Sequence, residues 1–112
     1  MRAYQRLLRY AQVYTTSDPD SACHPTTARQ LDLGRMLVEE LTALGLTDAR
    51  LDDHGYVYAT LPATPGCEGA KGLGFIAHMD TSPDAPGENV KPQLHENYDG
   101  GDVVLPPNSS PS

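Results

Sequence analysis

The chain has 112 residues, about the size of one domain and too short for two full hydrophobic cores. Its formal net charge is −7, so neither nucleic acid nor an anionic membrane surface is an expected partner, because both attract clusters of Lys and Arg. No apolar run reaches the length of a membrane span, and the amino terminus lacks the apolar core of a secretory signal. A soluble, cytoplasmic protein is expected.

The first predicted element is an amphipathic helix over residues 1–14, because apolar side chains recur there at helical spacing. Arg2, Arg6 and Arg9 are expected to form its solvated face rather than a functional basic patch. A polar loop, residues 15–24, follows, since its Ser, Asp and Pro residues favour turns. The two cysteines lack the spacing of a zinc knuckle or a disulfide framework, so both are expected to be free thiols.

A second, longer helix is predicted to begin at Pro25, Thr26 or Thr27 and to end at Gly45. Proline suits the first turn of a helix, a threonine hydroxyl can cap it, and glycine supplies the left-handed residue that stops it. Gly34 interrupts this helix at a cost of about 1 kcal/mol relative to alanine, and marks either close packing or simple tolerance. One side of this helix carries a stripe of leucines, which is expected to pack on a sheet. The stripe consists of Leu33, Leu37, Leu41 and Leu44.

Two strands, Asp48–Asp52 and Tyr56–Leu61, are predicted to form a β-hairpin. Gly55 suits the positive φ of a tight turn, and the second run is rich in strand-forming residues. His54 would then lie exposed at the tip of the hairpin. Residues 62–72 contain prolines and glycines and are expected to connect the hairpin to the next strand.

The apolar run Leu73–Ala77 predicts a buried strand that leads into His78 and Asp80. Side chains of a strand alternate between its faces, so these two should point the same way. A neutral imidazole is a good zinc ligand, and a nearby carboxylate can fix its ring. Two residues cannot complete a metal site, however, and the pair would equally suit a histidine that ends a core strand and an aspartate that caps the next loop.

The remaining residues are rich in proline, glycine and acidic side chains, and loops are expected. Residues 90–95 could form a short strand, and residues 105–112 are expected to be a disordered Pro/Ser tail. A second metal site is conceivable, but its candidate carboxylates lack calcium-loop spacing, which favours solvated loop acids. These candidates are Asp84, Glu88, Asp99 and Asp102.

Several blocks of the chain, in this order, resemble the amino-terminal quarter of the peptidase T family. These tripeptide aminopeptidases belong to the larger group of two-zinc exopeptidases and deacylases. The resemblance covers about nine tenths of the chain and is far more specific than His-x-Asp alone. The blocks are Met1–Leu8, Leu51–Pro62, Gly74–Thr81, Gly87–Pro92 and Glu96–Asp102.

The resemblance implies an α/β fold in which two helices pack on a small mixed sheet, with residues 1–104 forming part of a metallopeptidase catalytic domain. It implies that His78 is a zinc ligand and that Asp80 is the catalytic aspartate that supports the site. The family's other zinc ligands and its glutamate general base follow later in the sequence and have no counterpart before Ser112. We therefore expect a truncated copy that is inactive by itself.

Two alternatives stay open from the sequence. The chain could derive from a related deacylase or carboxypeptidase, whose substrate-recognising residues would also lie downstream. It could instead be a non-catalytic fragment that associates through an open sheet edge, including with a second copy of itself.

Overall fold

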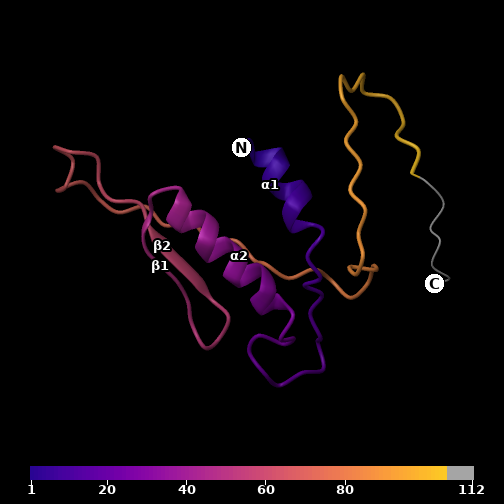
Figure 1. Cartoon of the computed structure of the whole chain (residues 1–112), viewed down its shortest axis with the longest axis horizontal. Helices are drawn as coiled ribbons and strands as arrows, with labels where there is room; N and C mark the ends of the chain where they lie inside the picture. The colour runs from indigo at the N-terminus through magenta and orange to yellow at the C-terminus, as the bar shows by residue number, and fades with distance from the viewer. Residues whose placement is uncertain (106–112) are drawn as a thin grey trace.

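The computed structural model describes residues 1–105, so most of the expected Pro/Ser tail, from Pro106 on, lies outside the described residues. Two helices and two strands follow one another along the chain: α1 (Ala3–Tyr10), α2 (Gln30–Ala43), β1 (Thr47–Leu51) and β2 (Val57–Thr60) (Figure 1). Within residues 1–105, neither helix has the length and apolarity needed to cross a membrane.

The predicted β-hairpin is present. β1 and β2 are antiparallel, and the Asp52 carboxylate closes the turn between them by accepting the backbone N–H groups of His54 at 2.9 Å and Tyr56 at 2.8 Å. Gly55 has a φ of +84°, which a residue with a side chain rarely adopts. Gly55, on which the prediction rested, therefore lies in the turn, and the Asp52 carboxylate adds a closure that the prediction did not include.

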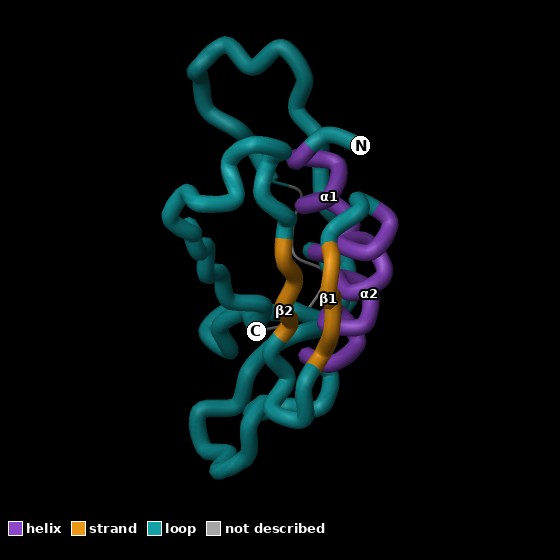
Figure 2. The backbone as a smooth tube through the Cα atoms, turned by 90° about the vertical axis from the view of Figure 1, so that its left-hand side faces the viewer, coloured by secondary structure: helices purple, strands orange, loops and turns teal. Residues whose placement is uncertain are grey.

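α2 lies along one side of the hairpin (Figure 2) and provides the small apolar core. Leu33, 5% exposed, is the single buried apolar side chain among residues 1–105. Gly34 is also buried, and a Cβ at this position would lie 2.9 Å from Cδ1 of Leu51 and 3.6 Å from Cγ2 of Val57. Gly34 therefore marks close packing of helix on sheet, and Gly45, with φ +88°, follows the end of the helix as predicted.

The beginning of α2 differs from the prediction, because the helix starts at Gln30 rather than at residues 25–27. The hydroxyl groups of Thr26 and Thr27 do not cap it; each accepts a hydrogen bond from Nε2 of Gln30 at 3.1 Å. Thr27 also donates to the carbonyl oxygen of Thr16 at 2.9 Å. The threonines thus connect the helix to the preceding polar loop, a role that local spacing does not reveal.

α1 is shorter than predicted. Of the three arginines assigned to its solvated face, Arg2 and Arg9 are exposed and Arg6 is half-buried, but two of them, Arg6 and Arg9, also form ion pairs with α2 that the sequence did not indicate. Nη1 of Arg6 and Nη1 of Arg9 lie 3.0 and 2.5 Å from the Glu40 carboxylate on α2, which also accepts a hydrogen bond from the Tyr10 hydroxyl. The hydrogen bond from Tyr10, opposed by partial burial and aided by both guanidinium groups, lowers the pKa of Glu40. Meanwhile Leu7, on the predicted apolar face, is 66% exposed.

The α/β fold class, with two helices and a small sheet, is confirmed. The sheet is antiparallel rather than mixed, because the strand predicted over Leu73–Ala77 does not form and leaves the hairpin as the whole sheet of the described residues. Within residues 1–105 the sheet has two strands. The chain turns at residues 65–70 after β2, and residues 71–80 then belong to neither a helix nor a strand. Phe75 is 90% exposed and Ile76 fully exposed. Residues 90–95 likewise form no strand. A buried strand needs paired neighbours and a covering layer, and the described residues supply neither to this segment.

Candidate metal centre

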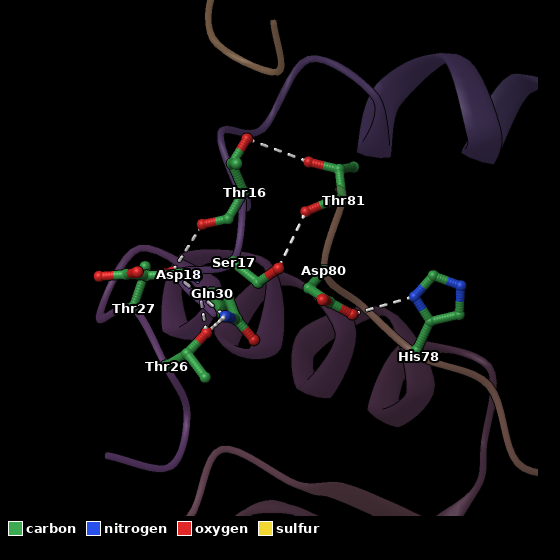
Figure 3. A network of polar contacts seen from close by, with 9 residues as sticks. All are labelled: Thr16, Ser17, Asp18, Thr26, Thr27, Gln30, His78, Asp80 and Thr81. Carbon is green, nitrogen blue, oxygen red and sulfur yellow. Dashed lines mark hydrogen bonds and ion pairs between the residues drawn. The ribbon is translucent and has the colours of Figure 1, made fainter. Parts of the chain in front are cut away.

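His78 and Asp80 lie on the extended segment after β2, and their side chains meet as the period-two alternation predicted. Nδ1 of His78 is 3.0 Å from Oδ1 of Asp80 (Figure 3). The imidazole is 85% exposed and the carboxylate 37% exposed. Because an ionised carboxylate only accepts hydrogen bonds, the proton of a neutral imidazole lies on Nδ1. Nε2 is then left with its lone pair directed away from Asp80, the form in which histidine binds metals.

The residue that follows this pair is attached to the loop before α2. The backbone N–H of Ser17 donates to the carbonyl oxygen of Thr81 at 3.0 Å, and the N–H of Thr81 lies 3.4 Å from the carbonyl oxygen of Thr15. Thr16 and Thr81 form a parallel bridge, and their hydroxyl oxygens are 3.1 Å apart. Asp80 therefore precedes a residue, Thr81, whose backbone N–H and C=O both form hydrogen bonds with this loop; Figure 3 shows Thr81 beside Thr16 and Ser17.

The loop that holds Thr81 is in turn held by the residues just before α2. The carbonyl oxygen of Thr16 accepts hydrogen bonds from Oγ1 of Thr27 and Nε of Arg29, each at 2.9 Å. Thr15 and Thr16 are buried, with 2% and 8% of their surface exposed. The guanidinium of Arg29 also lies over the ring of Tyr14, 4.1 Å from its centroid. The sequence predicted only a polar loop here, since nothing local indicates a pairing with Thr81.

The environment of Asp80 favours its ionised form. Partial burial raises the pKa of the carboxyl group, but hydrogen bonding from His78 and from the neighbouring Ser17 outweighs it, and the net pKa lies below the ordinary value. A carboxylate that stays charged near neutral pH keeps accepting from Nδ1 of His78, which fixes both the tautomer and the ring orientation.

The pair fits one position of a metal centre and its carboxylate support, but not a complete centre. Zinc sites in proteins use three or four protein ligands. Among residues 1–105 no three His, Cys, Asp or Glu side chains come together, and Pro106–Ser112 contains none of these residue types. The described structure thus does not gather Asp84, Glu88, Asp99 and Asp102 into the second site considered from the sequence.

An open cleft of about 580 Å³ lies beside the attachment at Thr81 rather than at the imidazole. It is bounded by the loop before α2 and by residues 83–88, and neither His78 nor Asp80 lines it. Both cysteines are free and exposed, as predicted. Neither borders the cleft.

No family model matches the chain. The chain is, however, 54% identical over 101 residues to peptidase T of Geobacillus kaustophilus (strain HTA426), a match that covers 90% of this chain and 24% of that protein. Peptidase T of Alkaliphilus oremlandii (strain OhILAs) is 55% identical over 104 residues, 90% of this chain and 25% of that protein. Peptidase T of Desulfitobacterium hafniense (strain Y51) is 53% identical over 103 residues, which cover 92% of this chain and 25% of that protein. The chain spans about a quarter of the length of these curated relatives.

Proposed function

From the premise that the chain carries peptidase T sequence over nine tenths of its length, we propose that it contributes one part of the metal centre of an aminopeptidase. The proposed substrates are short peptides, from which the enzyme releases the N-terminal residue, with tripeptides preferred. The proposed metal is zinc, and the proposed location is the cytoplasm. The relatives' name favours a peptidase over the deacylase alternative.

The observation that carries this proposal is the His78–Asp80 hydrogen bond, which leaves Nε2 of an exposed imidazole available. His78 acts as a metal ligand, and Asp80 positions its ring and keeps its proton on Nδ1. Zinc bound there would lower the pKa of a bound water to about 7 and polarise the scissile carbonyl. Without the metal, the hydrogen bond between these two residues holds the His78 imidazole in a fixed orientation.

The chain alone is proposed to be inactive. A hydrolytic zinc centre needs further ligands and a general base, and residues 1–105 bring no third ligand to His78 and Asp80. Association of copies of the chain through an open sheet edge stays a second proposal.

A zinc titration followed by NMR of the histidine rings tests the ligand role. We expect Nε2 of His78 to respond at lower zinc concentration than His54, an exposed histidine at the hairpin tip that stacks on Tyr56. Asp80→Asn should raise the zinc concentration needed for the His78 response about 10-fold to 100-fold, because the carboxylate partner is lost.

The outcome that contradicts the ligand role is a His78 response no earlier than that of His54, or one that Asp80→Asn leaves unchanged. The same zinc-loaded sample, and one loaded with cobalt, is then assayed for tripeptide hydrolysis. No turnover is expected, and robust turnover by the purified chain would refute the proposal that it is inactive alone.

A further inference from the structure

We propose that the cleft beside Thr81 binds the C-terminal carboxylate of a short peptide, and that the guanidinium of Arg29 is the group that recognises it. That the bound peptide is a substrate rests on the proposed function. Recognition of a carboxylate by Arg29 does not, and can be tested without any metal.

The guanidinium of Arg29 is held in one orientation at the cleft. Its Nε donates to the carbonyl oxygen of Thr16 at 2.9 Å, and its central carbon lies 4.1 Å from the centroid of the Tyr14 ring. All three residues line the cleft, and Arg29 is half-buried. Because Nε is engaged and the ring fixes the plane, the terminal N–H groups are positioned before a ligand arrives, which lowers the ordering cost of binding.

The terminal nitrogens of Arg29 have no partner in the part of the chain that the structure describes. Within residues 1–105 they form no hydrogen bond or ion pair, and the bond from Nε to Thr16 is the single hydrogen bond of this side chain. The two terminal nitrogens of a guanidinium match the two oxygens of a carboxylate, so a ligand with this group completes the arrangement. Four other arginines already pair with a carboxylate of the chain itself: Arg6, Arg9, Arg35 and Arg50.

The other groups of the cleft favour a peptide over a simple anion. Asp18, Asp20 and Glu88 also line it, and they repel a ligand that is only negative, such as acetate. A free peptide carries an ammonium group as well as its carboxylate at neutral pH, and the positive end offsets this repulsion. Much of the remaining wall is small and apolar and suits side chains such as alanine: Pro19, Pro83, Ala85 and Pro86.

The cleft adjoins the His78–Asp80 pair through Ser17. This serine lines the cleft, its side chain hydrogen-bonds with Asp80, and its hydroxyl also donates to the carbonyl oxygen of Thr81 at 3.2 Å (Figure 3). A peptide whose carboxylate is bound at Arg29 extends past Ser17 toward the His78 imidazole. The site thus sets the separation between the carboxylate end of the peptide and the proposed metal ligand, which favours peptides of one short length.

The test is a metal-free NMR titration of the chain with trialanine, followed at the Nε–H signal of Arg29 and the amide signal of Ser17. Trialanine amide should bind about 10-fold to 100-fold more weakly, because it lacks the charged group that Arg29 recognises. N-acetyl-trialanine, which keeps the carboxylate but loses the ammonium group, should bind at most about fivefold more weakly. The proposal is overturned if trialanine and its amide bind equally, or if acetylation weakens binding more than amidation does.

Arg29→Lys keeps the positive charge but loses the paired donors, and should weaken trialanine binding about 10-fold. Arg35→Lys is the matched control, since Arg35 is exposed on α2 and does not line the cleft, and it should bind as the unchanged chain does. Equal affinities of the two variants would contradict the role of Arg29. If Arg29→Lys also accelerates hydrogen exchange of the Ser17 amide, the loop has loosened, and the comparison of trialanine with its amide on the unchanged chain decides.

The zinc titration of His78 separates this inference from the proposed function. Selective binding of the free carboxylate together with a His78 response no earlier than that of His54 supports the Arg29 site and refutes the ligand role of His78. An early His78 response, with trialanine and its amide bound equally, supports the metal ligand and overturns the Arg29 site.

Discussion

The α2–hairpin unit, residues 30–60, and the segments on either side of it are held by different forces. Within the unit, Leu33 is buried and Gly34 allows the helix backbone to approach Leu51 and Val57. The flanking segments have larger apolar side chains, yet Leu7, Phe75 and others are exposed. Polar contacts fix these segments: α1 meets α2 through Glu40, and the segment after β2 meets the loop before α2 through Thr81.

This difference shows which interactions the chain can complete alone. A helix, a hairpin and their contact surface all lie within about thirty consecutive residues, so their packing needs only short loop closures. The apolar faces of α1 and of residues 73–77 find no such partner nearby in sequence. Polar groups nevertheless attach α1 to α2 and residue 81 to the loop before α2, because a single hydrogen bond or ion pair requires only one partner.

The largest effect is expected from Leu33→Ala, which removes the one buried apolar side chain of the described residues. Deletion of a buried leucine side chain costs about 2–5 kcal/mol, and a unit this small has only a few kcal/mol of stability. We expect urea denaturation, followed by circular dichroism, to show loss of most of the α2 and hairpin signal.

The matched control is Leu44→Ala at the end of α2, where the side chain is 57% exposed and the expected change is within about 0.5 kcal/mol. Equal losses in the two variants would mean that the unit is not held by apolar packing. Phe75→Ala, at an exposed position, should also leave the transition unchanged.

A smaller and more local effect is expected from Gly87→Ala, which acts on the polar attachment of the segment after β2. A Cβ at Gly87 would lie 2.3 Å from Oγ1 of Thr16 and 2.9 Å from Oγ1 of Thr81, too close for either hydroxyl to keep its position. The bridge should open, while the α2–hairpin unit remains folded. Hydrogen exchange of the Ser17 amide, which donates to Thr81, should accelerate at least about tenfold.

Gly72→Ala is the control for this variant, because a Cβ there meets nothing within 4 Å. Unchanged Ser17 exchange in Gly87→Ala would show that the close approach of Gly87 does not matter for the attachment. Loss of the hairpin signal in the same variant would contradict the separation of the two regions.

The parts of the fold that the sequence predicted are those whose determinants are local. The Asp52 turn with Gly55, the stop at Gly45 and the leucine stripe are all encoded within a few residues of the structure they form. The meeting of His78 and Asp80 is equally local, since it follows from alternation along an extended chain. The role of His78 as a zinc ligand stays a prediction.

The incorrect predictions concern interactions between distant residues. The predicted burial of residues 73–77 rests on their apolarity. Apolar side chains favour burial, but apolarity alone does not show that the chain contains residues to cover them. The ion pairs of Arg6 and Arg9 are absent from the sequence prediction, because an isolated helix gives no information about Glu40, some thirty residues away. The pairing of Thr16 with Thr81 spans 65 residues, and neither threonine carries a local mark of it.

The smallest effect is expected at the contact of α1 with α2, and it depends on pH. The pKa of Glu40 is below its ordinary value in the folded chain, so the unfolded chain binds its proton first as the pH falls. The contact therefore contributes fully above the ordinary carboxyl pKa of about 4.5 and is lost as the pH falls through the lower, folded value. An eight-residue helix is marginal without tertiary contacts, so α1 should lose helicity over this acidic range while α2 persists.

Glu40→Gln should remove this acid-dependent step, as measured by the amide chemical shifts of α1 between neutral and acidic pH. Glu39→Gln, at the adjacent exposed carboxylate, should retain it. If α1 instead melts at the same pH in both variants, other carboxylates control its docking. If α1 and α2 melt together, the contact at Glu40 belongs to the same cooperative unit as α2 and is not a separate attachment. The distinction between the apolar unit and its polar attachments then does not hold for α1.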